Sequence, residues 1–418
     1  MPHGDWGKLR KGKAMERHKG LKLATALLIV GAFALTALMT APAWAAKAPD
    51  KIRIGYTLAL SGKFTTLVGP FKKLGDNWAK LTNERGGIYV KEYGKKLPIE
   101  FVVYDDKSDP ATSAKFYERL VTQDKVHFLL GPFSSHISYA ATTVAEKHKV
   151  PMILICANDL KLFERQYKYS VTNLAPANTE LERYLQIIKA EGKAETLAIL
   201  AEDTLHSTGV LTGGVDKANE LGFKIVLKEI VPAGTRDFTA LITRIKAKNP
   251  DIVIVEAFPP FEIPFAKQAH EFKLRPKELF FGHITKAVAD AIGKGAENLT
   301  TSAPWASEWT HNPGVKDYHT ILERTGITFP QYMESSIRMW AYQELKLVIE
   351  KAGSLDREKI RKVMWKTSIP TISGVAKHNK RGIGNLQNSP MQFRNGRFYS
   401  LYPIENARKN HVYPNPWK

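Results

Sequence analysis

Small and polar residues follow two apolar runs of this sequence, at the points where strands would end. The runs are residues 126–130 and 150–155, and a helix-length segment separates them. Such a pattern indicates a βαβ unit whose parallel strands are buried on both faces, and ligands of these sheets bind outside the carboxyl ends of the strands. We therefore expect one rim of a binding pocket at the four residues that follow the runs: Ser134, Ser135, Ala157 and Asn158.

Catalytic motifs receive little support from the spacing of the residues. Ser134 is not a nucleophile elbow, because that motif needs glycines two residues to either side of the serine. A Ser/His/Asp triad would need His136, His206 or His283, and nothing positions one of them. We predict that the protein is not an enzyme, with an exported hydrolase as a distant alternative.

Metal and cofactor motifs are equally weak. Asp105, Asp106 and Asp109 resemble a metal cluster, but a strand-end turn that caps a helix explains them. The twelve histidines show no i, i+4 spacing with a glutamate, and no phosphate loop or complete G-x-G-x-x-G occurs. The sequence therefore predicts no metal site and no cofactor.

Strands and helices alternate through most of the chain. We expect strands at 51–60, 99–104, 126–130 and 150–155, with helices at 69–85, 111–123 and 138–148 between them. A second series follows, with strands at 197–201, 223–230, 252–257 and 279–281 and helices at 208–221, 237–248 and 263–272. A long helix is expected at 331–351. The fold class is α/β, with two lobes that each contain a doubly wound parallel sheet.

The first residues resemble a secretory signal peptide. A basic segment precedes an uncharged stretch at 23–39, and Ala43-Trp44-Ala45 gives a cleavage signal before Ala46. A transmembrane anchor is the alternative, since the apolar run approaches spanning length. We predict a signal peptide at 1–46, with Met15 as a possible start, and a mature protein in the periplasm.

Charge and cysteine content narrow the function classes. The net charge is +20; the first 46 residues contribute +5 of it, which leaves about +15 afterwards. Lysines and acids alternate without a dense basic run, so we predict no nucleic-acid partner. The single cysteine, Cys156, excludes an intrachain disulfide and is expected to be a packing residue.

Several short motifs, in order and at matching spacing over residues 52–403, resemble the periplasmic ligand-binding proteins of branched-chain amino-acid ABC transporters, which have the type I fold. The matching segments are Ile54-Gly55, Leu60-Ser61-Gly62, Asn83-Glu84-Arg85-Gly86-Gly87-Ile88, Tyr104-Asp105-Asp106, Ser108-Asp109-Pro110, Leu130-Gly131-Pro132, Val150-Pro151-Met152-Ile153, Asp237-Phe238, Leu241-Ile242 and Asn395-Gly396.

The resemblance implies two lobes that close on a small-molecule ligand and deliver it to an inner-membrane permease. The implied lobes are 47–172 plus 303–371 and 173–302 plus 372–418. Three crossing segments, near 171–175, 300–305 and 370–374, would form the hinge. We expect a monomer.

The resemblance also implies ligand-binding residues. In relatives that bind leucine-like amino acids, the ligand carboxylate is held at positions that match Ser135, Ala157 and Asn158. Three residues occupy the loop that packs the apolar part of the ligand: Phe64, Thr65 and Leu67. In the second lobe His206 replaces an aromatic residue and Phe258 stands in the aromatic wall.

The position that pairs with the ligand's ammonium group falls at His283 or Ile284, neither of which is acidic. A buried ammonium without a carboxylate partner costs several kcal/mol. We therefore expect a small organic acid with an apolar or aromatic body. Glu256 and Glu262 are close enough in sequence to restore an acidic partner, so an amino acid or amide remains the alternative.

Overall fold

The computed structural model describes residues 47–416, which form one compact unit from Pro49 onward. The predicted signal peptide at 1–46 lies outside the described residues. Within residues 47–416, no helix has both the length and the apolar composition needed to cross a membrane.

The first sheet has five parallel strands in the order β4-β1-β5-β6-β7. They are β1 (Ile52–Leu58), β4 (Ile99–Asp105), β5 (Phe128–Leu130), β6 (Met152–Leu154) and β7 (Ser170–Thr172). The helices that connect the first four strands are α3 (Phe71–Glu84), α4 (Pro110–Thr122) and α5 (Ser135–Lys147). Every residue of β5 and β6 is buried, as helices on both faces of a parallel sheet require. The predicted strand–helix alternation is confirmed here.

Helix caps explain where two of these helices begin. Asp109 accepts the N–H of Thr112 at 2.7 Å and Pro110 is the first helical residue of α4, as predicted. α5 begins three residues earlier than expected. Ser134 caps this helix by accepting the N–H of Ile137, which makes Ser135 its first residue.

The second sheet has seven strands in the order β16-β15-β12-β11-β10-β8-β9. They are β8 (Thr196–Glu202), β9 (Lys224–Val231), β10 (Ile252–Glu256), β11 (Glu278–Phe281), β12 (Thr300–Ala303), β15 (Ser389–Arg394) and β16 (Arg397–Ser400). The first five are parallel, whereas β15 and β16 add antiparallel strands at one edge. A hairpin reaches an edge without a crossover helix, which is why this mixed edge was not predicted.

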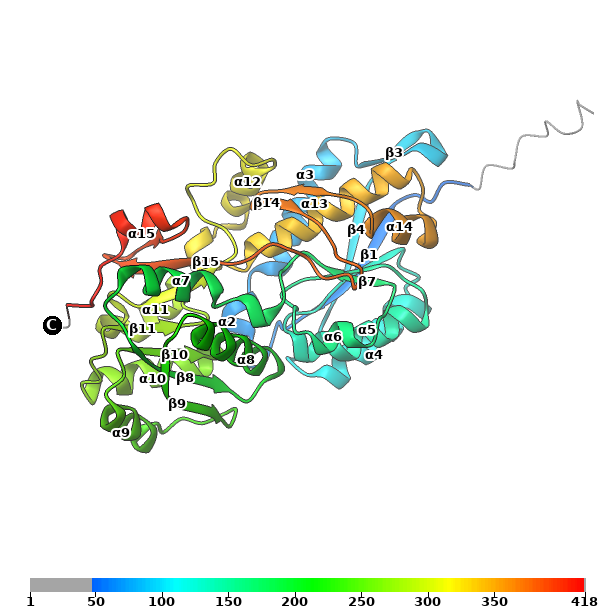
Figure 1. Ribbon diagram of the computed structural model, residues 1–418. Helices are drawn as coiled ribbons and strands as arrows, with labels where there is room; N and C mark the ends of the chain where they lie inside the picture. The colour runs from blue at the N-terminus through cyan, green and yellow to red at the C-terminus, as the bar shows by residue number, and fades with distance from the viewer. Residues whose placement is uncertain (1–46, 417–418) are drawn as a thin grey trace, which may run out of the picture. The chain divides into compact units, whose positions relative to one another are not determined.

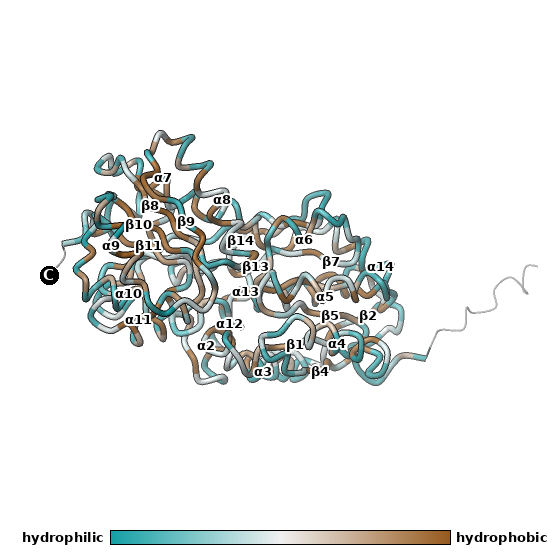
Figure 2. Tube along the Cα trace, turned by 90° about the horizontal axis from the view of Figure 1, so that it is seen from below, coloured by the Kyte–Doolittle hydropathy of each residue, from teal (hydrophilic) through white to brown (hydrophobic). Residues whose placement is uncertain are grey.

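The remaining elements surround the two sheets. They are α2 (Thr65–Val68), β2 (Ile88–Val90), β3 (Lys95–Leu97), α6 (Lys161–Glu164), α7 (Glu182–Glu191), α8 (Leu205–Glu220), α9 (Thr239–Lys248), α10 (Pro259–Glu271), α11 (Lys286–Ile292), α12 (Val315–Thr325), α13 (Ser335–Ala352), α14 (Arg357–Met364), β13 (Ile369–Thr371), β14 (Gly374–Ala376) and α15 (Ile404–Asn410). In Figure 1, α4, α5 and α6 lie beside the first sheet and α8, α9 and α10 lie around the second. Figure 2 shows hydrophobic chain along β8, β10 and β11, the interior of the second sheet.

The third crossing between the sheets differs from the expected one. Residues 370–374, predicted to be a linker, lie within the β13–β14 hairpin, where 372–373 join the two strands. Farther along the chain, Ile383 still packs in the core around β5 and β6, and Leu386 then pairs with Leu174, beside the first crossing. We therefore propose that the chain leaves the first lobe at about 384–388 rather than at 371/372. The other lobe boundaries stay predictions.

The C-terminal segment is tied to the second sheet by a buried histidine. His411 Nε2 lies 2.8 Å from a carboxylate oxygen of Glu278 on β11, and its Nδ1 lies 3.4 Å from Glu191 on α7. Burial alone would lower the pKa of His411, but the two carboxylates raise it above its ordinary value. The charged imidazole therefore stabilises the folded state.

This arrangement predicts a pH-dependent stability. Because the folded pKa of His411 is raised, its contribution is complete below the unfolded pKa and is lost as pH rises through the folded value. At acidic pH the wild type should have a larger free energy of unfolding than His411→Gln. This difference should shrink by about 2 kcal/mol on going to alkaline pH, because that is the usual contribution of a hydrogen bond to a charged group. Urea denaturation at a series of pH values measures it. A difference that does not change with pH would contradict the assignment.

Candidate functional site

The candidate site lies where strands of both sheets end. Six predicted residues share this position: Ser134, Ser135, Asn158, His206, Phe258 and His283. The first three follow β5 and β6 of the first sheet. The others follow β8, β10 and β11, which are neighbouring strands of the second sheet. Parallel strands bring such residues together because their carboxyl ends meet at one edge.

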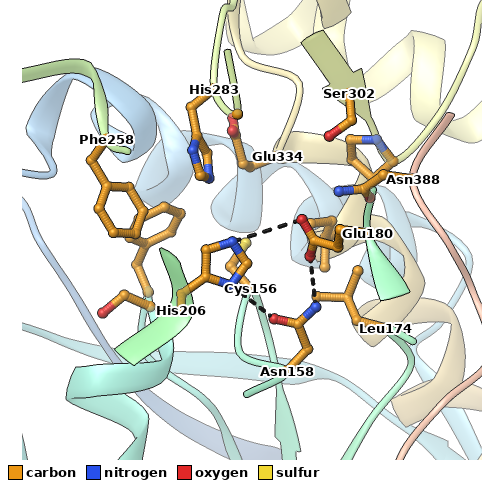
Figure 3. Close-up of a pocket in the computed structure, with 15 residues that line it drawn as sticks. Cys156, Asn158, Leu174, Glu180, His206, Phe258, His283, Ser302, Glu334 and Asn388 are labelled. Carbon is orange, nitrogen blue, oxygen red and sulfur yellow. Dashed lines mark hydrogen bonds and ion pairs between the residues drawn. The ribbon is translucent and has the colours of Figure 1, made fainter. Parts of the chain in front are cut away.

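A cavity between these loops is lined by five of the predicted residues: Ser134, Asn158, His206, Phe258 and His283. Sequence reasoning missed several others that also line it, among them Glu180, Glu334, Leu174, Ser302 and Asn388 (Figure 3). Glu334 immediately precedes α13, and Glu180 lies in the loop after β7; neither position carries a local motif that marks it. Among the described residues, none that lines this cavity is lysine or arginine.

Phe64 and Ser135 line a second hollow, which shares Ser134, His206 and Phe258 with the first. An aromatic cluster lies where the two hollows meet. The Phe64 ring is 4.9 Å from that of Phe258 and 5.1 Å from that of Phe133, measured between centroids. Because Phe64 follows β1 and Phe258 follows β10, this contact joins the two lobes.

Three predicted residues line neither hollow. Leu67 is fully buried in α2, and Ala157 packs in the core cluster around β6. Thr65, the first residue of α2, bonds back to the Gly62 carbonyl. The predicted loops are therefore at the site, but these side chains do not face either hollow.

Ser135 organises the loop after β6. Its hydroxyl oxygen accepts the backbone N–H groups of Asn158 and Asp159, both at 3.2 Å. The side chain is completely buried. In this arrangement Ser135 holds the rim in shape, whereas the neighbouring Ser134 faces the cavity.

Asn158 connects the two lobes. Its amide nitrogen donates to the Ala175 carbonyl at 2.9 Å and to Glu180 at 2.7 Å. Its amide oxygen is therefore the acceptor for His206 Nδ1, 3.1 Å away. These bonds fix the side chain in one orientation.

The imidazoles of His206 and His283 face one another, with centroids 5.7 Å apart (Figure 3). His283 Nδ1 lies 2.7 Å from the Ala257 carbonyl, so on both rings Nδ1 carries the hydrogen. The pKa of each histidine is lowered to about 4, by burial for His206 and by burial together with the neighbouring His206 for His283. At neutral pH both rings are uncharged, with an unprotonated Nε2.

Carboxyl groups surround the two rings. His206 Nε2 lies 3.7 Å from Glu180 and 3.6 Å from Glu256. Burial raises the pKa of both carboxyls, and for Glu256 the neighbouring Glu180 and Glu262 raise it further. Ile284 is buried, and Glu256 instead reaches the histidines from the end of β10.

Two more ionisable groups line the cavity. Burial raises the pKa of Glu334 to about 7. Burial also raises the pKa of the Cys156 thiol, which therefore stays protonated at neutral pH. A protonated thiol is a poor nucleophile, but Cys156 lines the cavity, so its expected packing role stays a prediction.

Residues 51–395 match the family model described as periplasmic binding protein. The chain belongs to the periplasmic binding protein family. Members of this family are transport proteins that bind a solute for an ABC transporter.

Known proteins are similar to this periplasmic binding protein over most of its length. The leucine-, isoleucine-, valine-, threonine- and alanine-binding protein of Pseudomonas aeruginosa is 25% identical over 346 residues, 80% of this chain and 87% of that protein. The predicted resemblance to the Leu/Ile/Val-binding class is confirmed.

Solved structures show the same fold. A leucine-binding protein of Thermotoga maritima has a TM-score of 0.74 and 19% identity, covering 87% of this chain and 99% of that one. A solute-binding protein of Rhodopseudomonas palustris in complex with p-hydroxybenzoic acid has a TM-score of 0.70 and 20% identity, covering 84% and 95%. The predicted type I fold is confirmed.

Proposed function

We propose that this protein is an exported substrate-binding protein that captures a small solute bearing both a carboxylate and an amino group. Amino acids and their close analogues are the proposed class. The two lobes close on the solute, and a permease in the inner membrane receives it. The observation that supports this ligand class is the set of hydrogen-bond acceptors around His206.

Glu180 accepts one hydrogen bond, from Asn158, but two other acceptors around His206 lack a donor. His206 Nε2 is unprotonated and faces Glu180 and Glu256, and Glu256 Oε1 has no hydrogen-bond partner among the described residues. An unpaired buried polar group costs about 1–3 kcal/mol. An ammonium group has three N–H donors and one positive charge, so it satisfies several of these acceptors at once. This favours the alternative that the sequence left open over an acid without an amino group.

The opposite rim suits the carboxylate. Ser134 faces the cavity at the N-terminus of the 13-residue helix α5, where backbone N–H groups attract anions. Lys63 and Lys161 line the adjoining hollow together with Asp203, so lysines outnumber carboxylates along the approach. A zwitterion therefore finds opposite charges at the two ends.

An aromatic or apolar acid is a second candidate. Phe133 and Phe258 line the cavity with their rings 6.2 Å apart, which suits a flat apolar body. A similar protein of Rhodopseudomonas palustris binds p-hydroxybenzoic acid. Glu180 and Glu256 would then have to be protonated, which their raised pKa values favour.

A thermal-shift screen with matched pairs separates the two candidates, because a bound ligand raises the melting temperature. The panel contains leucine with 4-methylpentanoate, phenylalanine with 3-phenylpropanoate, and 4-hydroxybenzoate. We expect the amino acid of a pair to stabilise the protein and its deaminated partner not to. The reverse result would exclude the amino-acid proposal. Recovery of the solute unchanged distinguishes capture from hydrolysis.

Two rim substitutions test the position of the site. Asn158→Ala removes the bonds to Ala175, Glu180 and His206, and Ser135→Ala releases the loop after β6. Each should weaken solute binding about tenfold, the worth of one or two hydrogen bonds, while the protein stays folded. Isothermal titration calorimetry measures the affinity. Ser138→Ala, in the same helix but outside the cavity lining, is the control. If both rim variants bind the solute with wild-type affinity, the solute does not bind at this rim.

A further inference from the structure

Three side chains at the carboxyl edge of the second sheet form a cluster of a different kind. Nitrogen atoms of His206 and His283 and a carboxylate oxygen of Glu256 all lie within 4.8 Å of one another. Glu256 is the last residue of β10, His206 lies in the first turn of α8 after β8, and His283 lies in the loop after β11. The three strands are adjacent in the sheet, so their carboxyl ends bring the three residues to one place, the kind of support that a preorganised site needs.

We propose that His206, His283 and Glu256 form a binding site for a divalent transition-metal ion. This goes against the expectation from sequence, which found no metal-ligand spacing. The sequence could not show the site, because the two histidines are far apart in the chain and meet only when β8 and β11 flank β10.

The groups behind the two imidazoles are those that metal-binding histidines usually have. His283 Nδ1 donates to the Ala257 carbonyl at 2.7 Å and His206 Nδ1 donates to Asn158 at 3.1 Å. Such bonds fix the tautomer and orient the ring, leaving Nε2 as the ligand atom. The two rings face one another (Figure 3). His206 Nε2 lies 3.6 Å from Glu256 Oε1, whereas the His283 nitrogen near that oxygen is Nδ1, at 3.9 Å, so the His283 ring has to rotate for its Nε2 to bind the same ion.

The carboxylate completes the donor set. Glu256 is 2% exposed and its Oε1 has no hydrogen-bond partner among the described residues. It lies 3.6 Å from His206 Nε2, whereas donors of a tetrahedral zinc site are about 3.4 Å apart. Glu180 lies 3.7 Å from the same nitrogen but outside the three-residue cluster, so a water molecule or a solute group would take the fourth position.

The donor types select the metal. Two imidazole nitrogens with carboxylate oxygens suit zinc, nickel, cobalt or copper, whereas magnesium and calcium prefer oxygen ligands alone. The proposal uses the cavity of the proposed function but does not require the solute to be an amino acid. Since the ion would take the acceptors assigned to the ammonium group, ion and amino-acid solute should compete.

Equilibrium dialysis of untagged, chelator-treated protein tests the site. Zinc, nickel and cobalt are compared with magnesium and calcium, and cobalt also reports its coordination through its visible absorption. We expect the transition metals to bind at this site. His206→Gln and His283→Gln should each weaken that binding by at least about tenfold. Loss of a residue that only supports a metal ligand already costs about tenfold in affinity, so loss of a ligand should cost no less. His148→Gln, a histidine paired with Glu118 away from the cavity, should bind like wild type.

Absence of transition-metal binding in the wild-type protein would overturn the proposal, as would equal binding by the wild type and both cavity variants. Circular dichroism of each variant establishes that it is folded. Binding of amino acids by metal-free protein that takes up no metal would overturn this inference alone. Metal binding by a protein that ignores every amino acid would overturn only the proposed solute class.

Discussion

Glu180→Gln is expected to lower the affinity for an amino-acid solute about 100-fold, which corresponds to roughly 3 kcal/mol. Glu180 Oε1 accepts from Asn158 at 2.7 Å, and Oε2 lies 3.7 Å from the unprotonated nitrogen of His206. Glutamine has the same shape and can keep the bond to Asn158. Its NH₂ group then replaces an acceptor by a donor and repels the ammonium group.

Isothermal titration calorimetry measures this loss, and the stability of the variant should not fall, because a buried ionisable group is removed without creating a void. Glu182→Gln is the matched control. Glu182 lies two residues away and accepts a bond from Gln387 outside the cavity. If Glu180→Gln binds amino acids as wild type does, the ammonium group is not bound at Glu180.

Gly384→Ala is expected to destabilise the folded protein by about 3 kcal/mol, at the upper end of the usual cost of overpacking. A Cβ at this position would lie 2.1 Å from the backbone oxygen of Asn173 and 2.2 Å from its carbonyl carbon. Backbone atoms cannot rotate away as a flexible side chain can. The two crossing segments that meet near Leu174 and Leu386 would have to separate.

Urea denaturation measures the effect on stability, and solute affinity should fall with it because the crossing segments set how the lobes meet. Gly295→Ala is the control, since its nearest neighbour is a side-chain carbon of His270 at 3.2 Å. Its cost should stay below about 1 kcal/mol. Equal stability of the two alanine variants would mean that the close approach at residue 384 is not required.

Much of the fold is readable from the sequence because its determinants are local. Apolar runs bounded by turn residues mark β1, β4, β5 and β6, and a single Asp-Pro pair sets the start of α4. The residues after those runs then had to meet at one edge of a parallel sheet. This argument placed Ser134 and Asn158 at the cavity, and the family resemblance added His206, Phe258 and His283, which also line it.

Other features depend on contacts between distant segments. β15 and β16 join the second sheet as antiparallel strands, and Ile383 returns to the first core after the β13–β14 hairpin. Neither segment carries a local signal for where it packs. Their positions depend on which sheet edge and which part of the core surface are not already covered by the other elements.

The sequence by itself determined the α/β alternation, the family resemblance and the loops that form the site. Only the tertiary structure decided which side chains of those loops face the cavity, placing Asn158 there and Ala157 in the core. It also brought Glu180 and Glu256 to the two histidines. The physical reason is that long-range packing sets the order of the strands and the orientation of each loop. Two neighbouring loop residues can therefore point in opposite directions, one into the core and the other into the cavity.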